Sequence, residues 1–143
     1  MDVATILKQK SAEVLSLPPT ASVAEAARVL AERHIGAVLV RSPAGQVLGI
    51  LSERDLVRGL AAQGGPALAL PVADLMTREV IACTPEDSVE HVMATMTQHR
   101  FRHLPVKRGD RLVGIISIGD VVKYRLDEIE FEARSLRAYI ANA

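Results

Sequence analysis

The sequence predicts an α/β (α+β) protein built from two copies of one β-α-β-β-α unit. The first observation behind this prediction is a seven-residue stretch that occurs twice, at residues 49–55 and 114–120. Each copy has a glycine, two aliphatic residues, a serine and an aspartate three positions after the serine. Read locally, each copy is a buried strand that runs into a helix, with the serine at the N-cap position.

The second observation is a longer set of matches that keep their order along the chain. With an offset of 66 residues, the matches include Val14 with Val80, Pro19 with Pro85, Ser22 with Ser88 and Val40 with Val106. One residue is lost near Pro43, and an offset of 65 then aligns Gly49 with Gly114, Ser52 with Ser117 and Asp55 with Asp120. Ordered matches of this kind indicate an internal duplication, and two units predict a duplicated domain rather than a solenoid.

The composition limits the class of protein. A chain of 143 residues, of which 49% are apolar, fits one compact domain or two small halves that share a core. Lysine plus arginine equals aspartate plus glutamate at 17 each, and tryptophan is absent, which argues against a nucleic-acid partner. The single cysteine excludes an intramolecular disulfide, and no apolar run is long enough to span a membrane. We therefore expect a soluble, cytoplasmic protein without a nucleic-acid or membrane partner.

The first unit follows a short arm, in which we expect Lys8 and Lys10 to point outward. Residues 14–17 form a predicted apolar strand that ends at two prolines. Ser22 then opens a helix through a capping box with Glu25, and apolar residues recur at helical spacing until about His34. The continuous apolar runs 37–40 and 47–51 indicate two buried strands around a turn, and a closing helix begins near residue 55.

The second unit repeats this order, with a strand at 80–83, a helix at 88–99, strands at 103–106 and 112–117, and a longer closing helix. A Gly-Gly-Pro break after the first closing helix starts a linker. We divide the chain into an arm (1–13), a first repeat (14–63), a linker (64–78), a second repeat (79–127) and a C-terminal helical extension (128–143).

The long closing helix carries an apolar stripe at spacings of 4, 3, 4, 3 and 4 residues: Val122, Leu126, Ile129, Ala133, Leu136 and Ile140. This is the a/d pattern of a coiled coil. The stripe either packs on its own domain or pairs with a partner helix. Because it continues past the end of the repeat, we expect a homodimer whose contacts include this helix.

Taken alone, each Ser/Asp pair is explained by a capping box in which aspartate replaces the usual glutamate or glutamine. The duplicated motif, the run His103-Leu104-Pro105-Val106 and the segment Asp74-Leu75-Met76-Thr77 together resemble the cystathionine-β-synthase (CBS) domain, in its tandem arrangement, the CBS pair. The resemblance covers about residues 14–127. It implies two repeats packed face to face about a pseudo-two-fold axis.

The resemblance also implies a function. Adenosine-type ligands bind the clefts between CBS repeats, and AMP, ADP, ATP, NAD and S-adenosylmethionine are the ligands that it suggests. Many members are regulatory modules, so we expect a sensor that signals through its conformation or its affinity for a partner. The alternative is a ligand-independent interaction or dimerisation module.

The chemistry of the motif fits an adenosine ligand. A carboxylate at the start of a helix can accept hydrogen bonds from both ribose hydroxyls, and the serine hydroxyl and helix N–H groups favour a phosphate. The glycine lets an adenine approach the strand, where Val38, Ile81 and Leu104 would enclose it.

The resemblance assigns residues to two sites that combine the Ser/Asp pair of one repeat with strands of the other. The first site comprises Ser52, Arg54, Asp55, Val80, Ile81, Thr84, Arg102, His103, Leu104 and Pro105. The second comprises Ser117, Asp120, Leu17, Pro18, Gly36, Ala37 and Val38. Because Gly36 and Ala37 replace Arg102 and His103, we expect phosphate-bearing ligands to prefer the first site.

Catalytic and metal sites are not predicted. The four histidines lack the spacing of metal ligands, and the sequence has no P-loop, GxGxxG motif or Ser-His-Asp set that we can identify. We therefore expect no enzymatic activity, no catalytic cofactor and no bound metal.

Overall fold

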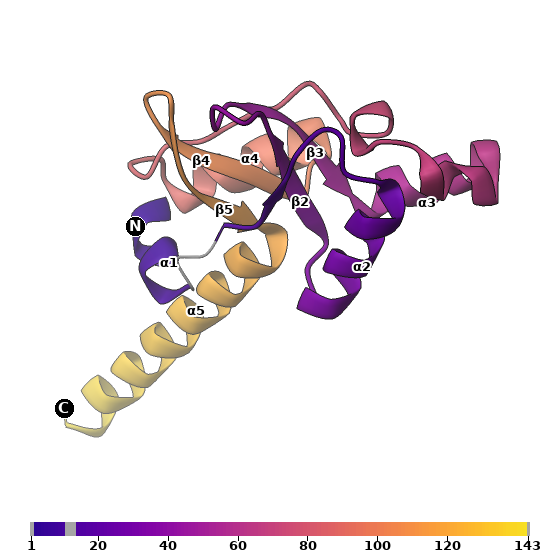
Figure 1. Ribbon diagram of the computed structural model, residues 1–143. Helices are drawn as coiled ribbons and strands as arrows, with labels where there is room; N and C mark the ends of the chain where they lie inside the picture. Colours follow the sequence, from indigo (N-terminus) through magenta and orange to yellow (C-terminus); the bar gives the residue numbers. More distant parts are fainter. Residues whose placement is uncertain (1, 11–13, 143) are drawn as a thin grey trace. The chain divides into compact units, whose positions relative to one another are not determined.

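The computed structural model describes residues 2–10 and 14–142 and divides into two compact units (Figure 1). The first-repeat unit comprises residues 13–81, and the second-repeat unit comprises residues 1–12 and 82–143. The N-terminal segment therefore belongs to the unit of the second repeat. Residues 1 and 11–13 of the predicted arm, and residue 143 of the predicted extension, lie outside the described residues.

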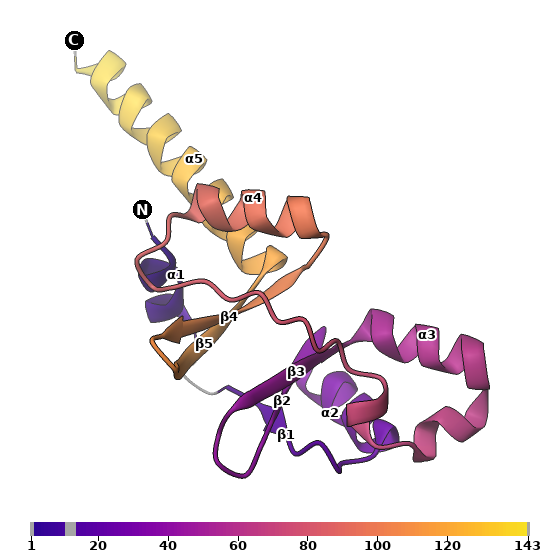
Figure 2. The same cartoon turned by 90° about the horizontal axis from the view of Figure 1, so that it is seen from above.

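The first-repeat unit has a three-stranded sheet in the order β1-β2-β3 (Figure 2). Its elements are β1 (Ser16–Leu17), α2 (Val23–Arg33), β2 (Ala37–Arg41), β3 (Val47–Ser52), α3 (Glu53–Gln63) and the 3₁₀ turns η1 (Gly65–Ala69) and η2 (Val72–Asp74). β2 runs parallel to β1 and antiparallel to β3. The apolar face of α2, through Ala26 and Leu30, packs with Val38, Val40 and Leu51 of the sheet, which gives this unit its core.

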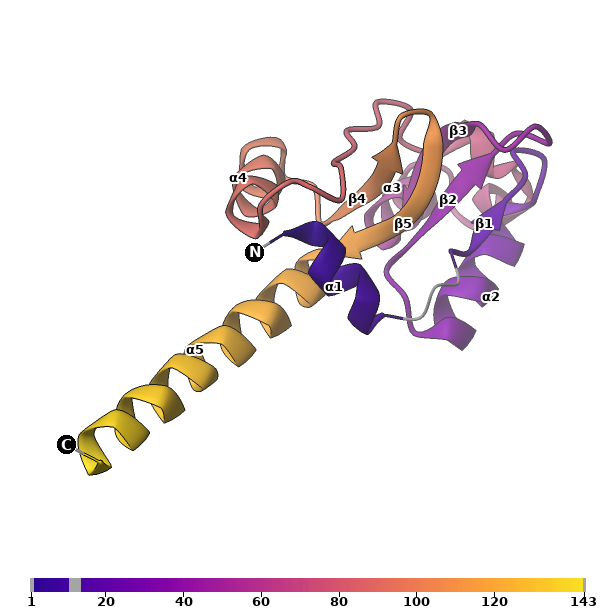
Figure 3. The same cartoon turned by 90° about the vertical axis from the view of Figure 1, so that its left-hand side faces the viewer.

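The second-repeat unit contains α1 (Val3–Gln9), α4 (Val89–His99), β4 (His103–Arg108), β5 (Arg111–Ser117) and α5 (Ile118–Ala141) (Figure 3). β4 and β5 form an antiparallel pair. Ser88 caps α4 by accepting a hydrogen bond from the His91 amide at 3.0 Å, as Ser22 caps α2 through the Glu25 amide at 3.1 Å. Both predicted helix starts are confirmed.

The strand register confirms the duplication. In the first repeat Ala37 pairs with Ser52 and Val40 pairs with Gly49. The equivalent pairs of the second repeat, with the predicted offsets of 66 and 65, are His103 with Ser117 and Val106 with Gly114. Each ladder shifts its register immediately after Val40 or Val106, so the irregularity of the first hairpin is repeated in the second.

The strand predicted at residues 80–83 is wrong except at Cys83. This residue makes a single parallel bridge to Val106, in which the Cys83 amide donates to the Pro105 carbonyl oxygen and the Lys107 amide donates to that of Cys83. The next bond of a parallel ladder would need an N–H group on Pro105, which proline lacks. Leu39 occupies the equivalent position in the first repeat and has this group, so β1 pairs at two residues.

Each repeat is completed by a segment that we call a strap: residues 70–77 for the first repeat and residues 2–10 for the second. The Val72 amide donates to the Ala21 carbonyl oxygen at 2.7 Å, and the Val3 amide donates to that of Asp87 at 2.9 Å. Ala21 and Asp87 are equivalent at the offset of 66. The two straps therefore dock in the same way on the two repeats.

The helix α5 extends beyond the other elements of its unit (Figure 3). Its buried residues are Val121 and Tyr124, near its beginning. The side chains of the predicted apolar stripe are exposed except for Ala133, which is half-buried. Within the described part of the chain, none of the helices combines the length and apolar character needed to cross a bilayer.

Candidate functional site

The two Ser/Asp pairs form capping boxes at the starts of α3 and α5. The Ser52 amide donates to Asp55 Oδ2 at 2.9 Å, and the Asp55 amide donates to Ser52 Oγ at 3.3 Å. The same two bonds in the second repeat, between Ser117 and Asp120, measure 2.8 and 3.1 Å. The capping interpretation is confirmed for both copies, and it fixes each carboxylate at the first turn of a helix.

The capping boxes also use most of the helix N–H groups that we expected to favour a phosphate. The amides at the N-cap and N3 positions bond within each box. The first helical amide of α3, on Glu53, donates to the Gly36 carbonyl oxygen at 3.0 Å, and that of α5, on Ile118, donates to Arg102 at 2.8 Å. Of these first-turn amides, those of Arg54 and Gly119 lie outside these bonds.

The Asp55 carboxylate has a further partner, Thr77, which belongs to the strap of the first repeat. Thr77 Oγ1 donates to Asp55 Oδ1 at 3.1 Å, and its distance to Oδ2 is 3.4 Å. Backbone bonds hold Thr77 in place, because its amide donates to the Ile50 carbonyl oxygen at 2.8 Å and its carbonyl accepts from the Ile50 amide at 3.0 Å. Asp55 is only 7% exposed.

The Asp120 carboxylate has a cationic partner, Lys10, from the strap of the second repeat. Lys10 Nζ lies 2.7 Å from Asp120 Oδ2 and donates to the Ile115 carbonyl oxygen at 2.9 Å. The expectation that Lys10 points outward is therefore wrong. Burial alone would raise the pKa of Asp120, but the hydrogen bonds from Lys10 and the Ser117 amide outweigh it and hold this pKa below its ordinary value.

The straps also fill the space in front of the motif glycines. A Cβ atom on Gly49 would lie 2.7 Å from the Thr77 carbonyl oxygen, and one on Gly114 would lie 2.8 Å from Leu7 Cδ2. We interpreted these glycines as room for an adenine. The close approach of each strap accounts for them without a ligand, which corrects that interpretation.

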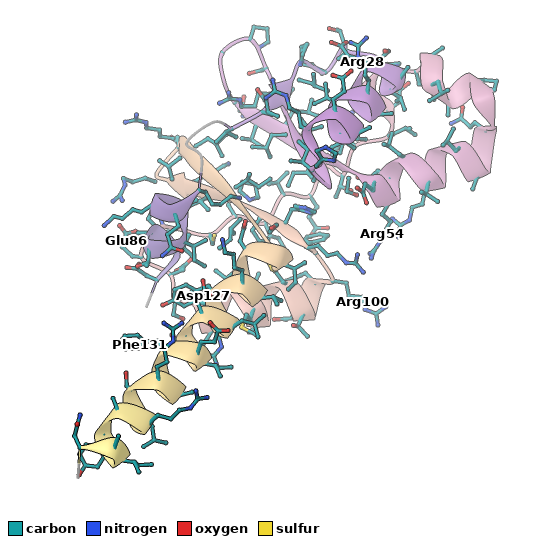
Figure 4. The ribbon with its side chains drawn as sticks, turned by 90° about the horizontal axis from the view of Figure 1, so that it is seen from below. Arg28, Arg54, Glu86, Arg100, Asp127 and Phe131 are labelled. Atoms are coloured by element: carbon teal, nitrogen blue, oxygen red, sulfur yellow. The ribbon has the colours of Figure 1, made fainter. Side chains whose placement is uncertain are left out.

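Other predicted site residues lie beside the Ser/Asp pair of their own repeat. Ala37 pairs with Ser52 at the start of α3, and His103 pairs with Ser117 at the start of α5. The combination of one repeat's pair with the other repeat's strands remains a prediction. Arg54 is exposed and projects from α3 (Figure 4). The side chains of Val38 and Leu104 are buried, so a base could meet these positions only through the backbone.

The remaining residues of the predicted set fall in both units. Val80 and Ile81 belong to the first-repeat unit, and Thr84, Leu104 and Pro105 belong to the second-repeat unit. Leu17 and Pro18 line an open hollow of about 450 Å³ in the first-repeat unit, together with Ser16, Arg41, Ser42, Pro43 and Gly45.

No catalytic arrangement emerges from the described residues. Burial raises the pKa of the Cys83 thiol to about 11, and the negative charge of Asp87 adds to this effect. The thiol is therefore protonated at neutral pH and is a poor nucleophile. Residues 2–10 and 14–142 contain no group of three His, Cys, Asp or Glu side chains placed to hold a metal ion.

Thr77 and Lys10 were not among the predicted site residues. The segment Asp74-Leu75-Met76-Thr77 was part of the resemblance, yet Thr77 was assigned to a linker rather than to the site. Lys10 gave no signal, because nothing near it in sequence indicates a partner 110 positions away.

A model of the CBS domain matches residues 3–62 and 72–127. The two matches begin at Val3 and Val72, the residues through which the straps make equivalent backbone hydrogen bonds. Each match therefore includes most of one strap, namely residues 3–10 in the first match and residues 72–77 in the second.

Curated and solved relatives agree with this match. A mitochondrial CBS domain-containing protein of Arabidopsis thaliana is 37% identical over 123 residues, which is 83% of this chain but only 60% of the relative. A crystal structure of a CBS-domain protein from Agrobacterium tumefaciens is 45% identical, with a TM-score of 0.85 over 87% of this chain and 92% of that one. A CBS domain protein from Pyrobaculum aerophilum, solved in complex with AMP, is 26% identical, with a TM-score of 0.74 over 84% of this chain and 89% of that one. The chain therefore belongs to the CBS domain family, and its two repeats are a tandem CBS pair.

Proposed function

We propose that this CBS pair is a regulatory module that binds an adenosine nucleotide, AMP or NAD before ATP. The observation that carries the proposal is the duplicated, capped carboxylate. Asp55 and Asp120 are each fixed at the start of a helix by the amide of the preceding serine. A carboxylate oriented in this way can accept hydrogen bonds from a ribose diol. The complex of the Pyrobaculum aerophilum relative with AMP supports the same class of ligand.

The two sites differ in the charge available for a phosphate. In the proposed first site, Asp55 works with Arg102 and His103, whereas the proposed second site has Gly36 and Ala37 at the equivalent positions. A charge-assisted hydrogen bond contributes about 1.5–3 kcal/mol, which corresponds to a roughly ten- to hundredfold change in affinity. We therefore expect AMP to bind more tightly at the Asp55 site.

Titration calorimetry with AMP and with adenosine tests this function. Arg102→Ala should weaken AMP by roughly ten- to hundredfold and change adenosine much less, since adenosine has no phosphate. Asp55→Asn should weaken both compounds, because both carry the ribose. Circular dichroism and urea unfolding of each variant separate a binding defect from a folding defect. Failure of AMP, NAD, ATP, S-adenosylmethionine and adenosine to bind or to raise the melting temperature would remove the sensor function.

A ligand-independent role as a dimerisation module is the second candidate, and the exposed stripe of α5 favours it. Five side chains of the stripe are between 49% and 64% exposed: Val122, Leu126, Ile129, Leu136 and Ile140. Burial of such a stripe against a second copy would remove this apolar area from water. We infer a homodimer in which the two α5 helices pair.

The charges beside the stripe favour a parallel pair. With Val122 at position d, Arg125 and Glu132 occupy g positions, and Glu130 and Arg137 occupy e positions five residues later. In a parallel, in-register coiled coil, each g residue faces the e residue five positions later on the partner. Both contacts then join opposite charges.

Light scattering and sedimentation test the dimer. Truncation after Asp127 should give a folded monomer. Glu132→Arg and Arg137→Glu should each weaken the dimer, and the double exchange should restore it only if the helices are parallel. Asp127→Arg is the matched control, because it changes the charge on the helix by the same amount at a b position. An unchanged dimer mass after truncation would show that α5 does not mediate association.

A further inference from the structure

The two straps close equivalent carboxylates with chemically different donors. In the first repeat, the Thr77 amide donates to the Ile50 carbonyl oxygen and the Thr77 hydroxyl donates to Asp55. In the second repeat, the equivalent acceptors are the Ile115 carbonyl oxygen and Asp120, and both accept from Lys10 Nζ. One ammonium group thus replaces a backbone amide and a hydroxyl.

The two closures differ in how they can open. Thr77 is fixed by a pair of backbone hydrogen bonds to Ile50, so it can leave Asp55 only if the strap leaves the strand. Lys10 reaches Asp120 with the end of a flexible side chain, and the Lys10 side chain is 31% exposed. Its rotation away would leave α1 docked, because Val3 and Ile6 are almost completely buried and the Val3 and Ala4 amides keep their bonds to Asp87 and Pro85.

The closures also differ in what they leave for a ligand. A threonine hydroxyl can turn and accept a hydrogen bond, whereas an ammonium group only donates. A ribose diol also only donates to a carboxylate, so it competes with Lys10 for Asp120. The competition is for Asp120 Oδ2, because the Lys10 ammonium and the Ser117 amide both donate to that oxygen.

We propose that Lys10 is a latch that closes the Asp120 site to a ribose. This inference rests on the proposed function. A ribose hydroxyl that takes the place of Lys10 on Asp120 Oδ2 must displace a charge-assisted hydrogen bond. Because the ion pair is partly exposed to water, we place its effect below the range for such bonds, at roughly fivefold in affinity.

The opposite role for Lys10 makes the opposite prediction. The ammonium group has three N–H donors, and two of them bond to Asp120 and Ile115. If the third bound a ligand phosphate, removal of Lys10 would weaken AMP. If Lys10 is a latch, its removal strengthens adenosine, which has no phosphate for the lysine to attract.

Calorimetric titration of the full chain with adenosine and AMP distinguishes these roles. In the wild type, we expect one tighter site, which Asp55→Asn removes. Lys10→Met should tighten adenosine at a second site by roughly fivefold, and Asp120→Asn in the same chain should abolish this gain. Lys10→Gln, which is uncharged but polar, gives an independent variant in case Lys10→Met impairs folding. Lys8→Met is the matched control, because Lys8 is an exposed lysine near the end of α1, two residues before Lys10, and should change nothing.

The outcomes separate the latch from the function on which it rests. If the wild type binds at the Asp55 site but neither Lys10 variant strengthens adenosine, the latch is wrong and the nucleotide function stands. Weaker AMP binding in both Lys10 variants would identify Lys10 as a phosphate contact and would also overturn the latch. If no variant binds any adenosine compound, both proposals are wrong.

Discussion

The two straps lie against equivalent strands, but the first is held there by backbone hydrogen bonds and the second by a lysine side chain. Thr77 and Ile50 form two backbone hydrogen bonds, whereas the Ile115 carbonyl oxygen accepts a hydrogen bond from Lys10 Nζ. The capping boxes beside them have the same geometry within a few tenths of an ångström. After duplication, the strand-to-helix turn stayed alike while the segments that cover it diverged. A backbone contact survives substitution of its side chain, but a single change removes the contact made by Lys10.

The largest expected difference between the two repeats is the loss of stability when each motif glycine is replaced by alanine. The new methyl group of Gly49→Ala would meet the Thr77 backbone oxygen, whereas that of Gly114→Ala would meet the end of the Leu7 side chain, which can move. We expect Gly49→Ala to lower the free energy of unfolding by about 1–3 kcal/mol, and Gly114→Ala to lower it by less. Urea unfolding of the two variants measures both values. A greater loss in Gly114→Ala would show that the first strap, not the second, is the more adaptable.

Replacement of either capping serine by alanine should lower the free energy of unfolding by less than Gly49→Ala does, and by a similar amount in the two repeats. Ser52→Ala and Ser117→Ala each remove the side-chain acceptor of an N3 amide and leave the strap in place. Loss of such a cap costs about 1 kcal/mol of unfolding free energy. The same urea experiment tests both variants. A larger loss in Ser52→Ala would be due to the additional hydrogen bond from the Ser52 hydroxyl to Asp55 Oδ2. A larger loss in Ser117→Ala would mean that the second strap contributes to its cap.

The smallest expected effect is the pH dependence of the Lys10–Asp120 pair. Because the pKa of Asp120 is lowered in the folded protein, the pair contributes stability above the ordinary pKa of 3.8 and loses it as the pH falls through the lowered value. Wild type and Lys10→Met should therefore differ at pH 7, by no more than about 1 kcal/mol for a partly exposed pair, and converge in acid. Unfolding of both proteins at pH 7 and in acid, with Lys8→Met as control, measures this. If the two proteins still differ in unfolding free energy in acid, the difference comes from packing of the aliphatic part of the Lys10 side chain and not from the ion pair.

Local signals predicted much of this molecule. The three-residue spacing of Ser52 and Asp55 defines a capping box within one turn, and the offset between the repeats predicted which strand residues pair. Contacts over long sequence separations were missed. Lys10 and Asp120 are 110 positions apart, and no periodicity links them. The strand at 80–83 was wrong because its pairing depends on an N–H group that Pro105, on another strand, does not have.

The assignment of α1 to the second-repeat unit changes what counts as a domain boundary in this chain. A fragment that begins at residue 82 would lack α1, whose Val3 and Ile6 side chains are buried in this unit. It would expose the surface on which α1 docks. A chain that carries residues 1–12 together with residues 82–143, through a connection long enough for α1 to dock, would instead keep the unit whole. Dissection of this chain into separately expressed halves should follow this spatial partition, since a cut in the linker alone separates the second repeat from part of its own core.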